Sequence, residues 1–216
     1  MTIAQNPPDW ESTFAHFLIH NSDMSDAAHD LEHIRRVVNT ATMLAHSEGA
    51  DLAVVLPAAW LHDCVMVPKD SPLRPQASMM AAEKAITFLK HIAYPTNNID
   101  AIYHAIEAHS FSANILPRTR EAQIVRDADR LDAIGAIGIA RCLMLGGAMG
   151  RRFYDADDPF GETRQLDDNT NVIDHFYSKL LRLADGMMTE AGRAEAQRRT
   201  AFMQQFLVQL RVELNL

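Results

Sequence analysis

Apolar residues recur at helical spacing along most of this chain, whereas the alternating pattern of a half-buried strand is nearly absent. In one stretch Leu31, Ile34, Val38 and Leu44 fall on one face of a helix. The periodicity predicts an all-α protein with helices near residues 9–20, 28–47, 52–67, 76–92, 98–110, 119–130, 134–149, 172–184 and 188–213.

The length of 216 residues fits one large domain or two small ones. We find no domain boundary, so we expect a single domain over residues 1–216. Its core should lie at about 25–150, with C-terminal helices at about 172–213 packed on it. Residues 151–171 form the longest irregular stretch, and a loop this long is more often functional or mobile than idle.

The net charge of −8 and the pI of about 5.6 argue against broad binding to nucleic acids or anionic membranes, which requires basic surface. A small phosphorylated molecule is compatible, because it needs only a local pocket of cations. The N-terminus lacks the pattern of a signal peptide, and no apolar run reaches the roughly 18 residues of a membrane span. We expect a cytoplasmic protein with two reduced cysteines, as a monomer or a homodimer.

The adjacent pair His62-Asp63 follows an apolar run, Leu52–Leu61, that should be buried. Buried charge is costly unless it is paired or bound to a metal. On a regular helix neighbouring side chains project about 100° apart, but both could reach an ion lying off the helix end. The alternative for the pair alone is a satisfied polar patch.

Two further stretches offer metal-binding side chains. His29 and His33 are four residues apart and share a helix face, although histidines at this spacing also occur by chance. The block Asp127-Ala-Asp129-Arg-Leu-Asp132 places three aspartates beside an apolar helix, where a salt-bridge cluster is the alternative. Two histidines and two aspartates from three helices would form a mixed nitrogen and oxygen site for a divalent ion.

In this order and spacing, the motifs resemble the HD-domain metal-dependent phosphohydrolases, and in particular a bacterial subgroup of small stand-alone hydrolases. The resemblance covers about residues 25–200 and rests on His29-Asp-x-x-His33-x-x-Arg36-Val, Leu61-His-Asp63, Glu107-Ala-His-Ser-Phe111, Asp127-Ala-Asp-Arg-Leu-Asp-Ala-Ile-Gly135 and Lys179-Leu-Leu181. It implies an all-α HD-domain helical bundle with the metal site between core helices. It also implies one divalent ion (Mn, Mg, Fe, Ni, Co or Zn) with the ligands His33, His62, Asp63 and Asp129.

Members of this family mostly hydrolyse phosphate esters or anhydrides, so the resemblance implies a small phosphorylated substrate such as a nucleotide. A divalent ion polarises a phosphoryl oxygen and lowers the pKa of a bound water, while nearby cations stabilise the developing charge. The predicted cations are Arg36, Lys69, Arg130 and Lys179. Each has a structural alternative, such as a solvated loop lysine for Lys69 or an aspartate partner for Arg36.

The proton-transfer group is harder to predict. Several HD phosphohydrolases carry an acid shortly after the His-Asp pair, but Met66 stands three residues after Asp63 and the next acid is Asp70. We rank His109 and Glu107 first as catalytic candidates beside Asp63. Some HD enzymes bind a second metal through two extra histidines, here His104 and His109. A five-residue step places these two roughly 140° apart on a helix, which favours a site with one metal and with His109 contacting the substrate or the attacking water.

Two other functions stay open at this point: a di-iron oxygenase on the HD fold, which needs the extra histidines, and a non-catalytic nucleotide-binding sensor that retains the metal pocket. The sequence leaves open the native metal, the substrate and the bond cleaved.

Overall fold

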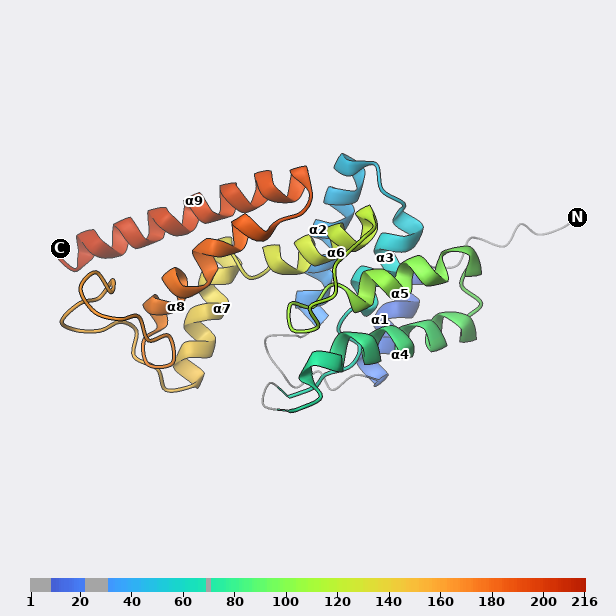
Figure 1. Ribbon diagram of the computed structural model, residues 1–216, viewed down its shortest axis with the longest axis horizontal. Coiled ribbons are helices and arrows are strands. Elements are labelled where there is room, and N and C mark those ends of the chain that lie inside the picture. The colour runs from blue at the N-terminus through green and yellow to red at the C-terminus, as the bar shows by residue number, and fades with distance from the viewer. Residues whose placement is uncertain (1–8, 22–30, 69–70) are drawn as a thin grey trace, which may run out of the picture.

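The computed structural model describes residues 9–21, 31–68 and 71–216 (Figure 1). Its elements are α1 (Trp10–Asn21), α2 (Leu31–Glu48), α3 (Leu52–Leu61), η1 (Arg74–Gln76), α4 (Ala77–His91), η2 (Thr96–Asn98), α5 (Ile99–Glu107), α6 (Arg120–Leu131), α7 (Gly135–Ala148), α8 (Val172–Ser178), η3 (Leu180–Gly186) and α9 (Glu190–Glu213). Within these residues the only extended pairing is one isolated bridge, between Arg152 and Asn171. The predicted all-α class is therefore confirmed.

The elements α1 to α6 form what we call the N-terminal half. In it α2 packs against both α3 and α6, while α5 contacts α3, α4 and α6 (Figure 1). The centre is apolar and includes the fully buried Ile34, Leu44, Val55, Ile102 and Ile124. Each fully buried aliphatic side chain of this size contributes about 1.5–3 kcal/mol, so the packing holds the ends of α2, α3 and α6 in fixed relative positions.

Local signals set several helix boundaries. Gly49 follows α2 with a φ of 65°, in the left-handed region that favours glycine. The Asp51 carboxylate then accepts a hydrogen bond of 2.8 Å from the Ala53 amide and caps α3. Thr119 and Thr189 cap α6 and α9 in the same way.

Two helix ends differ from the prediction. The helix expected to run almost to Pro68 ends at Leu61, with His62 as its C-cap. The helix expected over 172–184 breaks at Lys179, whose φ and ψ are −136° and −60°, and the chain continues as the tighter η3. Apolar residues keep helical spacing across this break, so periodicity alone could not reveal it.

The C-terminal half comprises α7 to α9 and the segment between α7 and α8. Helix α7 meets α6 at a bend of 57°. Helix α7 is buried on one face only: Gly146 packs tightly on Val172, while Ile137 and Met144 are exposed. Within the described residues, no single helix is long and apolar enough to cross a membrane, and the bent α6–α7 pair meets that test by length and composition alone.

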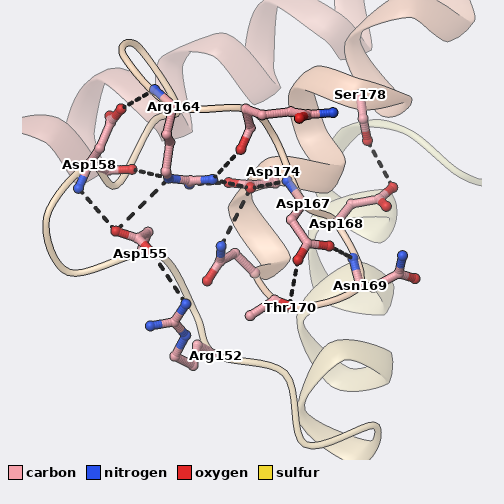
Figure 2. Close-up of polar contacts among 12 residues, drawn as sticks. Arg152, Asp155, Asp158, Arg164, Asp167, Asp168, Asn169, Thr170, Asp174 and Ser178 are labelled. Atoms are coloured by element: carbon pink, nitrogen blue, oxygen red, sulfur yellow. Dashed lines mark hydrogen bonds and ion pairs between the residues drawn. The ribbon is translucent and has the colours of Figure 1, made fainter.

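The segment 151–171 has no helix or named strand, yet polar contacts fix its course (Figure 2). Arg164 pairs with the buried Asp174 of α8 through two contacts of 2.6 Å, and the Asp167 amide donates to the same carboxylate. The Asp158 carboxylate accepts hydrogen bonds from the backbone amides of residues 162–164.

Helix α9 contacts α2 and α6 in the N-terminal half as well as α7 and η3 in the C-terminal half. The single domain over 1–216 stays a prediction.

Candidate metal centre

The centre of the site is His62, which the end of α3 places in the protein interior. Its Nδ1 lies 2.8 Å from the carbonyl of Ala59, one turn back in the same helix, and this contact fixes the ring. Burial lowers the pKa of His62, which favours the neutral imidazole that binds metals. Within the described residues Nε2 is buried and has no hydrogen-bond partner. Such an atom requires an explanation, and a metal ion provides one.

Carboxylates and a second imidazole surround this nitrogen at distances too long for hydrogen bonds. Asp63 Oδ2 lies 3.6 Å and Asp129 Oδ1 3.9 Å from His62 Nε2, and His33 Nε2 lies 3.6 Å from the same Asp129 oxygen. His33, His62 and Asp129 each offer a ligand atom within 4.8 Å of the others. Imidazoles and carboxylates together suit a divalent ion of the borderline or hard type, and Asp63 adjoins this group through His62. The structure thus brings together all four residues that the sequence predicts as ligands.

His109 contacts the Asp63 oxygen that does not face His62. Its Nε2 is 3.5 Å from Asp63 Oδ1, its ring centroid is 4.9 Å from that of His62, and its Nδ1 lies 2.6 Å from the carbonyl of Ile106. Burial opposes protonation of His109, but the hydrogen bond and charge of Asp63 outweigh it and raise the pKa. His62, Asp63 and His109 form a second group with ligand atoms within 4.8 Å of one another. His109 is therefore placed to contact an ion, or a water bound to one.

The other extra histidine has a different environment. His104 Nδ1 lies 2.9 Å from Glu107 Oε1, and its Nε2 accepts a hydrogen bond of 2.9 Å from the Arg118 amide. Both ring nitrogens are thus engaged away from the four ligand candidates. Glu107, a predicted catalytic candidate, contacts His104 and does not line the cavities described below.

Asp132 contacts His33 on the side of the ring that faces away from the other ligand candidates. The sequence had not assigned it a role. Its Oδ2 lies 2.7 Å from His33 Nδ1, on the opposite side of the ring from the cluster. Arg36 binds the same carboxylate with contacts of 2.7 and 3.1 Å, and Arg141 of α7 binds Oδ2 as well. Burial opposes ionisation of Asp132, but these partners hold its pKa well below the usual range. A carboxylate behind a ligating histidine fixes the ring orientation and makes the ligand more basic.

The three aspartates of the predicted block therefore have three separate environments. Asp129 faces His33 and His62, while Asp132 lies behind His33. Asp127 is fully buried and accepts hydrogen bonds from the Met188 and Thr189 amides, which anchors the start of α9. Asp132, the C-cap of α6, follows Asp129 by three residues and so lies near the same side of the helix end, and this was the sequence signal that could have identified Asp132.

The cluster opens into a cavity of about 660 Å³, which we call the large cavity. Its lining includes His33 and Asp129 from the N-terminal half, together with Phe111, Arg130, Arg141, Asp168, Ser178, Lys179 and Arg182. An adjacent cavity of about 360 Å³ is lined by Asp63 and His109, and it shares Phe111, Asp129 and Lys179 with the large cavity. The candidate centre thus lies where the two cavities meet.

The predicted substrate-binding cations fall into three groups. Lys179 and Arg130 line the large cavity, and Arg130 also donates a hydrogen bond of 3.0 Å to the Gly186 carbonyl. Arg36 binds Asp132 and lines a separate cavity of about 440 Å³. Lys69 lies outside the described residues.

Sequence reasoning missed Arg141, Asp168 and Arg182. Each lies in the C-terminal half, where no motif distinguished it from an ordinary surface charge.

Comparisons with known proteins identify the family. A family model described as the HD domain matches residues 30–134. YpgQ of Bacillus subtilis (strain 168) is 34% identical over 192 residues, which cover 87% of this chain and 85% of YpgQ.

Two solved structures are similar over nearly their whole length. An HD-superfamily hydrolase from Bacillus thuringiensis is 35% identical, with 94% of this chain and 96% of the other covered and a TM-score of 0.73. The crystal structure of Bacillus subtilis YpgQ in complex with ADP is 32% identical, with 94% and 93% covered and a TM-score of 0.70. The chain therefore belongs to the HD domain family, as its motifs predict. Small bacterial proteins such as YpgQ are its relatives.

Proposed function

We propose that this protein is a divalent-metal-dependent hydrolase of phosphate ester or anhydride bonds in a small phosphorylated metabolite such as a nucleotide. One observation carries the proposal: the group His33, His62 and Asp129 borders the large cavity, which Arg141, Lys179 and Arg182 also line. The structure of YpgQ with ADP supports a nucleotide as the ligand class, because YpgQ is similar along most of the chain.

His33, His62, Asp63 and Asp129 would hold the metal ion. When bound, a divalent ion supplies a Lewis acid for a phosphoryl oxygen and makes a nearby water more acidic. Asp132 contributes by fixing His33 from behind.

The remaining steps belong to the protein's own side chains. Lys179 and Arg182 bind the phosphate oxygens and offset the charge that develops during phosphoryl transfer, which depends mainly on positioning and electrostatics. His109 faces Asp63 and the adjacent cavity, where it can orient a water or exchange a proton at Nε2. Glu107 is the weaker candidate, since its carboxylate contacts His104.

A screen of phosphorylated metabolites with Mn²⁺, Mg²⁺, Ni²⁺ and Co²⁺ tests the proposal, with detection of both phosphate and pyrophosphate. We expect turnover of at least one nucleotide that His62→Ala and Asp63→Ala each abolish. Asp157→Asn, on the surface of segment 151–171, is a matched control that should keep full activity. Activity that survives both ligand substitutions would contradict the assignment, and nucleotide binding without any turnover would favour a sensor.

The second donor group, His62-Asp63-His109, supports one alternative, a centre with two metal ions. A binuclear hydrolase or a di-iron oxygenase would require such a two-metal centre. Metal content per chain, measured for the unmodified protein and for His109→Ala and His104→Ala, separates the cases. We expect one equivalent in all three proteins, and loss of a second equivalent on either substitution would favour a binuclear centre. The cytoplasmic location and the choice between monomer and homodimer stay predictions.

A further inference from the structure

The large cavity contains one acidic side chain apart from the metal cluster. Arg130, Arg141, Lys179 and Arg182 line it, and Asp168 lies among these cations. Hydrogen bonds from His175 and Ser178 lower the pKa of Asp168, so its carboxylate is ionised at neutral pH. A carboxylate repels phosphate, and its place in a cavity suited to phosphate therefore points to another part of the ligand.

Asp168 is held in a defined orientation. Within the described residues both side-chain hydrogen bonds to it end on Oδ2: His175 Nδ1 lies 2.8 Å away and Ser178 Oγ 2.9 Å away. The contact with Ser178 is visible in Figure 2. The side chain is 36% exposed, so Oδ1 keeps its capacity to accept a hydrogen bond from a ligand.

The segment before Asp168 explains why this orientation is stable. The Asp167 amide donates a hydrogen bond of 2.7 Å to the buried Asp174, which Arg164 binds through both of its terminal nitrogens (Figure 2). The Asp167 carboxylate accepts hydrogen bonds from the Asn169 amide and the Thr170 hydroxyl. The backbone on both sides of Asp168 is thereby fixed, and a fixed acceptor distinguishes ligands better than a mobile one.

We propose that Asp168 is a specificity-determining residue that accepts a hydrogen bond from a donor on the non-phosphate part of the substrate, namely a sugar hydroxyl or an exocyclic amine. The cations bind the phosphate groups, and Asp168 recognises the nucleoside. A site with a buried or ordered acceptor rejects a ligand that lacks the matching donor, because the acceptor then loses water without gaining a partner.

This inference rests on the proposed function, and the experiment separates the two. The kcat and KM of the unmodified protein and of Asp168→Asn are measured with adenine nucleotides, with their 2′,3′-dideoxy forms, and with purine nucleotides that lack the 6-amino group. Asp157→Asn makes the same chemical change on the exposed surface of the same segment and serves as the control. Asp168→Ser is a second variant, and thermal unfolding verifies that each protein is folded.

The unmodified protein should prefer the donor-bearing nucleotide over one of the two analogues by about tenfold or more in kcat/KM, mainly through KM. The analogue with the lower kcat/KM shows whether the donor belongs to the sugar or to the base. Asp168→Asn and Asp168→Ser should reduce this preference to less than about threefold, while Asp157→Asn should keep it. An equal decrease in kcat/KM for all nucleotides in the Asp168 variants would overturn the role of Asp168, and so would the absence of a preference in the unmodified protein. Absence of turnover for every nucleotide would instead count against the proposed function.

Discussion

The two halves of the molecule fix their polar residues in different ways. In the N-terminal half, apolar packing of α2, α3 and α6 holds the buried His33 and His62, and local caps set the helix ends. In the C-terminal half, ion pairs and side-chain hydrogen bonds to backbone amides hold segment 151–171 in place (Figure 2). The first half contributes the candidate metal ligands, and the second contributes Arg141, Asp168, Lys179 and Arg182 to the lining of the large cavity. Changes in the two halves should therefore affect different measurable quantities.

The largest expected effect is in the N-terminal half. His62→Ala removes the ligand candidate shared by both donor groups. Loss of the metal should lower kcat/KM on the order of a thousandfold, since Lewis-acid catalysis contributes several kcal/mol. Titration calorimetry with Mn²⁺ should show the matching loss of binding. Normal Mn²⁺ affinity in this variant would remove the cluster from consideration as the metal centre.

The corresponding test in the C-terminal half concerns stability. Arg164→Met leaves the fully buried Asp174 carboxylate without its ion-pair partner and should lower the free energy of unfolding by about 3 kcal/mol. Arg152→Met is the matched control, because the Arg152–Asp155 pair is exposed and should contribute less than about 1 kcal/mol. Urea unfolding of both variants measures the difference. Similar values for the two would show that the network does not stabilise this half.

Asp132 connects the halves, because Arg36 comes from α2 and Arg141 from α7. Asp132→Asn keeps the size of the side chain but weakens the support of His33. Metal affinity should fall by about 10- to 100-fold, as is usual when the partner of a ligating histidine is lost. Asp132→Glu should recover part of that affinity if the carboxylate charge matters. An unchanged metal affinity in the asparagine variant would limit Asp132 to a structural role.

A smaller effect is expected for the cavity wall. Lys179→Met should raise KM for a phosphorylated substrate by about tenfold, since a charge-assisted hydrogen bond is lost. Its metal affinity should stay the same, in contrast to His62→Ala. A parallel fall in metal affinity would show that the two halves do not divide the functions as we describe.

The smallest effect concerns acid pH. The backbone amides of Thr163 and Glu162 hold the pKa of Asp158 below its usual range. In the same way, the backbone amides of Asp157 and Asp158 lower the pKa of Asp155. A carboxylate whose pKa is lower in the folded state stabilises that state fully when the pH is above its ordinary pKa of about 3.9. This stabilisation is lost as the pH falls toward the lower pKa of the folded state. Hydrogen exchange of the 162–164 amides, corrected for intrinsic rates, should keep its protection down to about pH 4 and lose it below. Loss of protection at pH 5 to 6 would contradict this account.

The sequence by itself determined the helical class, most helix positions and the four metal-ligand candidates. The helices follow from the local spacing of apolar residues, and the four ligand candidates from the resemblance of the ordered His, His-Asp and Asp motifs to the HD-domain family. Histidine and aspartate beside an apolar helix are costly without a partner, so the sequence alone marks them as unusual.

Only the tertiary structure decided which charges surround the site. It placed Asp132 against Arg36, turned His104 toward Glu107, and brought Asp168 and Arg182 into the large cavity. A charged side chain in a polar segment has the same local pattern whether it lines a cavity or faces bulk water. The distinction arises from contacts between residues far apart in the chain, such as the 99 positions that separate His33 from Asp132.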